Sequence, residues 1–198
     1  QLSIRWIEEA VNKYMNKILG TDDDYVVAVD TDSVYINFGP MVERIKPERP
    51  IDFLAKVASE KIEPFIDKSY LELKEYTNAY EQKMIMKREN IGDKAIWTAK
   101  KRYIMNVWDS EGVRYNEPKL KMMGIEAIRS STPAACREYI KETLKLVMAT
   151  DESTVQKYIA DIRQEFEALP FEKIAFPRGV NLVGKQTDQS TGKSVTVS

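Results

Sequence analysis

Two aspartates separated by a single residue, Asp30 and Asp32, are the strongest candidates for chemistry in this sequence. They lie in the segment DTDS between two apolar runs, YVVAV and VYINF, a pattern typical of a tight β-hairpin. If the chain is extended there, alternate side chains project from one face about 6.5 to 7 Å apart, close enough to share one hard cation. Mg²⁺ or Mn²⁺ in such a site neutralises phosphate charge and orients an in-line attack, so the pattern indicates phosphoryl transfer.

A purely structural role for DTDS is the alternative, since Asp and Ser side chains readily hydrogen-bond the backbone of a turn. A turn needs only one aspartate, however. A second carboxylate at the end of a buried strand favours a bound cation. The neighbouring acidic residues, Asp22, Asp23 and Asp24, fit a solvated loop better than a metal site.

The composition limits the available chemistry. The 198 residues include no histidine and one cysteine, Cys136. Histidine-dependent triads and histidine zinc sites are therefore excluded, and any metal must be held by carboxylates. A lone cysteine fits a reducing cytosol, which for a viral protein would be the host cytoplasm. No apolar run approaches the roughly 20 residues of a membrane span, so we expect a soluble protein.

Positive charge gathers in the middle of the chain. The formal net charge is -1, yet the segment from Lys83 to Arg129 holds eleven Lys and Arg against six Asp and Glu. Clustered cations of this kind are needed to neutralise phosphates. By itself the densest cluster is more typical of a solvated strand edge or turn. That cluster is KKRY, which comprises Lys100, Lys101, Arg102 and Tyr103.

The patterning predicts an α+β fold. Apolar spacing and stop signals predict helices over 2–19, 53–76 with a kink at Pro64, 132–148 and 153–169. The hairpin over 25–38 and a strand-rich region over 83–123 complete the prediction. Its strands would be MIMKRE, WTAKKRYIMNVW and a return after a DSEG turn.

The last two helices should form an antiparallel pair. We expect the first to be capped by Thr132 with Pro133 as its first residue, and the second by a capping box of Ser153 and Gln156. From Pro177 onward the polar composition predicts a mobile or irregular end.

Several segments of the chain resemble family B DNA polymerases. YVVAVDTDSVYINF resembles the palm hairpin whose two aspartates bind the catalytic metals, and WIEEAVNKYMNKILGTDDDY resembles the helix before it in T-even-type bacteriophage members. WTAKKRYIMNVWDSEG resembles the segment that contacts the primer-template, and KMMGIEAIRSSTP resembles the palm-to-thumb junction. The resemblance implies a palm portion over 1–123, with a small mainly antiparallel sheet and packed helices. It implies the start of the thumb, a helical hairpin and an irregular tail, over 124–198.

The same resemblance implies site residues. Asp30 and Asp32 would be catalytic metal ligands, and Glu89 resembles a further palm carboxylate near the metals, although a paired surface glutamate would look the same. A helix-capping role remains open for the residues of the junction. The implied DNA contacts are Lys100, Lys101, Arg102, Tyr103, Lys119, Lys121 and Arg129.

The implied activity is template-directed nucleotidyl transfer by a two-metal mechanism, with Mg²⁺ or Mn²⁺, primer-template DNA and an incoming dNTP. A sliding clamp would be a partner of the full enzyme. Because no segment resembles the exonuclease, the first palm aspartate or the fingers, we expect the isolated chain to be inactive. It would be either a fragment or one subunit of a split polymerase that needs the N-terminal part.

Two other functions were weighed. A non-catalytic DNA-binding or assembly module could keep the palm fold without the chemistry. An unrelated phosphohydrolase using DTD is disfavoured, because nothing else in the sequence supplies a nucleophile or a phosphate cradle.

Overall fold

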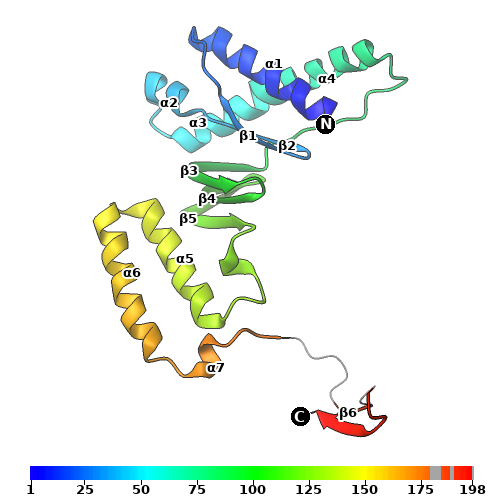
Figure 1. Cartoon of the computed structure of the whole chain (residues 1–198). Coiled ribbons are helices and arrows are strands. Elements are labelled where there is room, and N and C mark those ends of the chain that lie inside the picture. The colour runs from blue at the N-terminus through cyan, green and yellow to red at the C-terminus, as the bar shows by residue number, and fades with distance from the viewer. Residues whose placement is uncertain (179–183, 188–189, 198) are drawn as a thin grey trace. The chain divides into compact units, whose positions relative to one another are not determined.

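The computed structural model describes residues 1–178, 184–187 and 190–197, and it contains helices and antiparallel sheets (Figure 1). The predicted α+β class is therefore confirmed. The chain divides into two compact units, 1–123 and 124–198, and each is described by itself.

Helix α1, Leu2–Leu19, forms the centre of the first unit. Its apolar stripe places Ile7, Val11 and Met15 in the core with no exposed surface. Gly20 ends the helix in the left-handed conformation, at φ 67°, and its N–H bonds back to the carbonyl of Asn16. The predicted helix and its glycine stop are confirmed.

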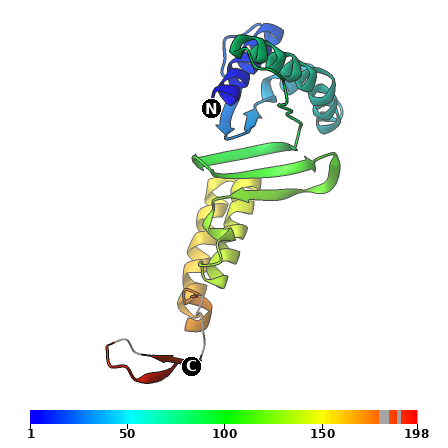
Figure 2. The ribbon, with the colours of Figure 1, turned by 90° about the vertical axis from the view of Figure 1, so that its right-hand side faces the viewer.

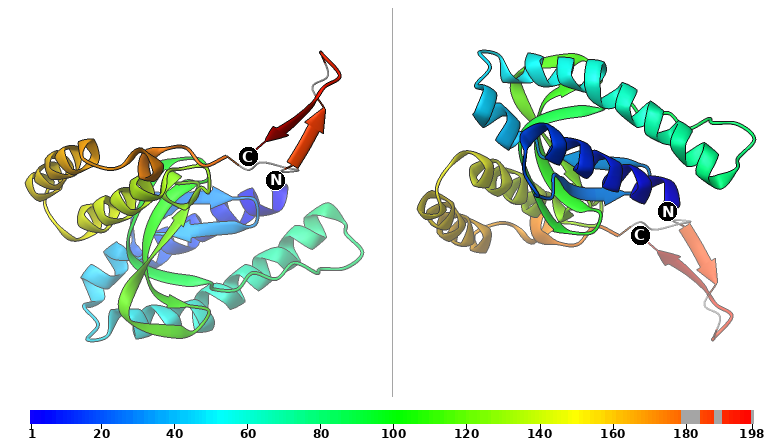
Figure 3. Two further views of the ribbon diagram at one scale, coloured as in Figure 1. Left: turned by 90° about the horizontal axis from the view of Figure 1, so that it is seen from below. Right: turned by 90° about the horizontal axis from the view of Figure 1, so that it is seen from above.

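A second helical layer packs along α1. It consists of α2 Gly39–Ile45, α3 Pro50–Val57, a π-helical turn η1 Ala58–Ile62 and α4 Glu63–Thr77. The irregularity predicted at Pro64 is the π-helical turn that directly precedes it, where the helix widens instead of breaking. Figure 3 shows α4 running beside α1.

The carboxylate segment forms the predicted hairpin. Strands β1 Val26–Asp30 and β2 Ser33–Ile36 are antiparallel. The helix α1 fixes the start of β1, because the Asn12 Oδ1 accepts the N–H groups of Tyr25 and Val26 at 2.8 and 2.9 Å. One side chain thus ties the hairpin to the helix that carries the core.

A three-stranded antiparallel sheet follows, with the order β3-β4-β5 (Figure 2). Its strands are β3 Asn90–Ala99, β4 Arg102–Ser110 and β5 Val113–Met123, and Glu111 and Gly112 turn between the last two as predicted.

Two strand predictions were wrong. The MIMKRE segment lies outside the sheet, which begins at Asn90. WTAKKRYIMNVW is not one strand either, because the chain reverses at Lys100 and Lys101, the latter at φ 60°. KKRY is therefore the tip and outgoing side of a second hairpin.

A buried carboxylate anchors this sheet. Asp109 on β4 is 2% exposed, accepts the Gly112 N–H at 3.1 Å and forms ion pairs with Arg88 and Arg114. Arg114 in turn contacts Asp52 of α3 at 2.7 Å. Burial raises the pKa of Asp109, but the hydrogen bonds from Arg88 and Gly112 and the two positive charges together hold it below the ordinary value.

The second unit contains the predicted helical pair, which lies side by side and antiparallel in Figures 1 and 2. The Tyr139 hydroxyl donates to Glu165 across the pair at 3.3 Å. The elements of the unit are η2 Glu126–Ile128, α5 Ala134–Ala149, α6 Glu152–Glu167, α7 Phe171–Ile174, β6 Gly184–Thr187 and β7 Ser194–Val197.

Both predicted caps of this pair were wrong. Pro133, not Thr132, occupies the N-cap of α5, and the α6 cap is Asp151, whose carboxylate accepts the Thr154 N–H. Asp151 lies two residues before Ser153, the cap that we assigned, so the helix is capped two residues earlier and Gln156 bonds Glu152 instead. Part of the tail expected to be irregular forms the β6–β7 pair; the remainder, 179–183, 188–189 and 198, lies outside the described residues.

Asp109→Asn should lower the free energy of unfolding by about 2 kcal/mol at pH 7, because two arginines lose a buried ionic partner. The folded-state pKa lies below the unfolded one, so the contribution is present above about pH 4 and is lost as the pH falls through the folded pKa. Urea unfolding at pH 7 and at pH 3 measures both effects. Asp93→Asn on the exposed part of β3 is the control, and an equal loss in both variants would contradict the assignment.

Candidate functional site

The hairpin turn holds both candidate carboxylates at one tip. Asp30 faces Ser33 across the last rung of the hairpin, which leaves Thr31 and Asp32 as the turn itself. Thr31 has φ 21°, so the chain is not extended between the aspartates and the strand-based spacing does not apply. Asp32 is exposed, whereas the side chain of Asp30 is 26% exposed.

The tip of the second hairpin reaches Asp30. The Lys101 Nζ lies 3.2 Å from the Asp30 Oδ1 and 3.4 Å from the Thr31 Oγ1. The hydrogen bond from Lys101 is the largest cause that holds the pKa of Asp30 below its ordinary value, against a smaller opposing effect of burial. The structure thus joins the two segments that sequence reasoning singled out separately.

A cleft of about 250 Å³ opens between the two hairpins. One wall carries Asp30, and the other carries Lys100 and Lys101. Aromatic rings line the space between them. They belong to Tyr35 on β2, Trp97 on β3 and Tyr103 on β4.

The carboxylates offer a partial cation site. Asp30 and Asp32 provide the oxygen ligands that Mg²⁺ and Mn²⁺ prefer, and Asp32 has no protein partner within the described ranges. No group of three or more Asp, Glu, Cys or His suited to a metal occurs among the residues the structure describes. Two carboxylates alone would hold a cation only loosely, because the residues that the structure describes place no third acidic ligand beside them.

Glu89 lies apart from this pair. Its carboxylate is 3.9 Å from the Lys121 Nζ, and it is near enough to Tyr103 to contribute to the raised pKa of that hydroxyl. Burial and the hydrogen bond with Tyr35 are the larger causes, and the charge of Asp30 contributes as well. Glu89 is not one of the residues that line the cleft.

The remaining cationic candidates are distributed over both units. Lys100 is exposed at the turn, and Lys119 lies 3.9 Å above the Tyr115 ring on β5. Arg129 belongs to the second unit, where it contacts the Gly124 carbonyl and Glu126. Within the first unit, the KKRY turn contacts the carboxylate tip through Lys101.

Sequence reasoning missed Tyr35 and Trp97. Trp97 pairs with Tyr103 across the β3–β4 ladder, and placing the turn at Lys100–Lys101 would have revealed that pairing. Tyr35 offers no such signal, because its partners are 62 or more residues away in the sequence.

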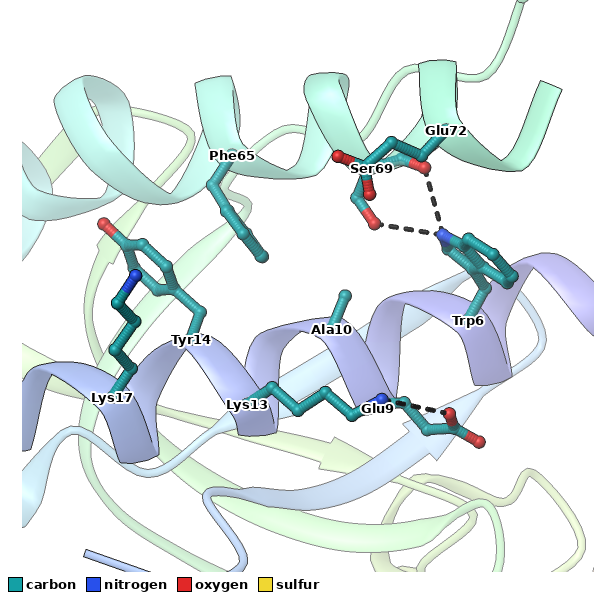
Figure 4. A pocket seen from close by; sticks show the side chains of 9 residues that line it. All are labelled: Trp6, Glu9, Ala10, Lys13, Tyr14, Lys17, Phe65, Ser69 and Glu72. Atoms are coloured by element: carbon teal, nitrogen blue, oxygen red, sulfur yellow. Dashed lines mark hydrogen bonds and ion pairs between the residues drawn. The ribbon is translucent and has the colours of Figure 1, made fainter. Parts of the chain in front are cut away.

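A larger cavity of about 370 Å³ lies between α1 and α4 and shares no lining residue with the cleft. Figure 4 shows Tyr14 and Phe65 facing one another across it, and the Trp6 indole donating to the carbonyl and hydroxyl of Ser69. Lys13 pairs with Glu9 at its rim. Because none of its lining residues borders the cleft, it adds nothing to the carboxylate site. In the part of the chain that is described, no helix is both long and apolar enough to cross a bilayer.

Comparison with known proteins shows which proteins the chain resembles. No family profile matches the chain, but it is homologous to a segment of DNA-directed DNA polymerases. One relative is the DNA-directed DNA polymerase of Enterobacteria phage T4, 37% identical over 96% of this chain, and another is that of Escherichia phage RB69, 38% identical over 93%. The resemblance to T-even-type phage polymerases is thereby confirmed. The chain spans only 23% and 22% of the lengths of these relatives.

Lys101→Gln should raise the pKa of the Asp30 carboxyl toward its ordinary value of 3.8, because the main favourable partner of the charged form is removed. Carboxyl ¹³C NMR titration measures the change. Lys100→Gln removes a neighbouring charge without a contact to Asp30 and should move this pKa less. If the two variants behave alike, the Lys101 contact is not formed in solution.

Proposed function

We propose that this chain is the palm and thumb-start portion of a DNA-directed DNA polymerase, with 1–123 as palm and 124–198 as the beginning of the thumb. The observation that carries the proposal is the contact of the Asp30–Asp32 tip with the KKRY turn. It occurs in a chain homologous to part of two phage polymerases. Carboxylates that would bind a metal ion and basic side chains that would bind phosphates therefore lie at the same cleft.

Asp30 and Asp32 would hold the divalent cation, Mg²⁺ or Mn²⁺. When bound, the cation neutralises charge on the transferred phosphate and orients the attacking hydroxyl. Glu89 is a further acidic candidate, although its carboxylate pairs with Lys121 at 3.9 Å.

Lys100, Lys101 and Arg102 would bind phosphates of the primer-template and set its register without reading its sequence. Lys101 would exchange its exposed ion pair with Asp30 for a DNA phosphate, an exchange that costs little because such pairs contribute about 1 kcal/mol or less. Lys119, Lys121 and Arg129 are further candidate backbone contacts. The Tyr115 ring under Lys119 would hold that side chain extended.

The proposed activity needs more chain than is present here. Two-metal transfer requires carboxylates that converge from separate segments, and the described residues supply one pair at one tip. The complementary ligands, the dNTP-binding residues and the sliding-clamp contact would belong to the rest of the polymerase. The rest of the polymerase would be either another part of the same polypeptide or a second subunit.

Mixing the chain with the remaining polymerase part should restore primer extension with Mg²⁺, while either part alone stays inactive. Asp32→Ala should reduce extension by at least about 10³-fold, because the cation loses one of its two ligands here. DNA binding should stay within about twofold of wild type. Asp22→Ala, in the nearby acidic loop, is the matched control. Undiminished extension by Asp32→Ala would reject the metal role.

Lys100→Ala should weaken duplex binding about equally for all sequences and reduce the slope of log K against log salt by about one. Fluorescence anisotropy with a labelled primer-template over a salt series measures this. Lys13→Ala, an equally exposed lysine on α1, should leave the slope unchanged. Equal slopes for wild type and Lys100→Ala would remove Lys100 from the interface.

A further inference from the structure

Three aromatic rings join the carboxylate hairpin to the basic hairpin. The Tyr35 ring lies 5.1 Å from Trp97 and 5.4 Å from Tyr103, centroid to centroid, in both cases edge to face. The Trp97 and Tyr103 rings lie 5.7 Å apart. Edge-to-face contacts at these separations are favourable beyond the area they bury.

A hydrogen bond completes this junction. The Tyr35 hydroxyl donates to the Tyr103 hydroxyl at 3.0 Å. Tyr103 is only 4% exposed, so most of its surface is committed to neighbours and little is left for a DNA strand. The aromatic member of KKRY is therefore better suited to position its basic neighbours than to touch the duplex itself.

The exposed ion pair between the hairpins cannot hold the two tips at a fixed spacing. Lys101 is 59% exposed in its pair with Asp30, and solvent screening leaves such pairs little stabilising free energy. The pair is also broken whenever Lys101 turns to a phosphate. The half-buried hydroxyl pair does not involve Lys101 and persists through that exchange, so together with the rings it can keep the two tips at a constant spacing.

We propose that Tyr35 is a positioning residue of the polymerase site. Through its hydrogen bond to Tyr103 it fixes the carboxylate tip relative to the KKRY turn, so that cation and primer phosphates meet in the reactive arrangement. The inference rests on the proposed function and extends it to a residue that contacts neither metal nor DNA. Small displacements of positioned groups have large effects on rate, which makes a single hydrogen bond measurable.

A double-mutant cycle in the reconstituted polymerase tests this. Tyr35→Phe and Tyr103→Phe each remove the same hydrogen bond and keep the rings. Each should lower the maximal rate of single-nucleotide incorporation about two- to tenfold, with the duplex Kd within twofold of wild type. The double variant should be no slower than the slower single variant, because the bond is lost only once. Tyr80→Phe, fully exposed, is the matched control.

Three outcomes would overturn the proposal. They are unchanged rates in both single variants, a double variant whose loss is the product of the two, and a loss confined to the duplex Kd, which would make Tyr103 a direct DNA contact. Thermal unfolding of each variant shows whether the rate follows stability alone.

Hydrogen exchange on the chain by itself separates this inference from the proposed function. In Tyr35→Phe, backbone amides of residues 28–34 and 97–104 should exchange faster, while those of α1 stay protected. This readout needs no activity. If the reconstituted wild type fails to extend primers, the proposed function is wrong, and unchanged exchange in both segments would still reject the positioning role.

Discussion

The contact between two hairpin tips is the constraint on which the rest of this molecule depends. The chain brings Asp30 to within 3.2 Å of Lys101, and it does so by packing Tyr35 against Trp97 and Tyr103. Opposite charges would attract at many relative positions, but interlocked rings and a hydroxyl pair permit few. The aromatic contact, in which Tyr103 is buried and the other two rings are half-buried, sets the geometry of the exposed charges.

Helix α1 anchors the carboxylate hairpin to the core of the first unit. Its side chains at Ile7, Val11 and Met15 form the core of the first unit, and Asn12, between them in sequence, holds the start of β1 through two backbone bonds. On the other side, Asp109 ties the three-stranded sheet to α3 through Arg114. Each hairpin is thus anchored separately, which leaves their spacing to the residues where they meet.

The acidic tip of the first hairpin leaves one carboxylate open to solvent. This carboxylate, of Asp32, has no protein partner in the ranges described and lies beside a turn rich in cations. An exposed carboxylate beside lysines is the arrangement on which the proposed binding of a metal ion and phosphates rests. This matches a chain that spans under a quarter of the length of its polymerase relatives.

The sequence by itself determined the elements with strong local signals: α1 with its Gly20 stop, the hairpin around DTDS and the paired helices of the second unit. It also identified Asp30, Lys100 and Lys101 as residues of interest. Only the tertiary structure decided that Lys101 meets Asp30 and that Tyr35 closes the junction, because these contacts join residues 62 to 71 positions apart. It also showed that KKRY bends at its lysines, where the β3–β4 pairing begins. The periodicity of apolar residues reports the local helix or strand. Contacts between residues this far apart in the sequence are determined by tertiary packing.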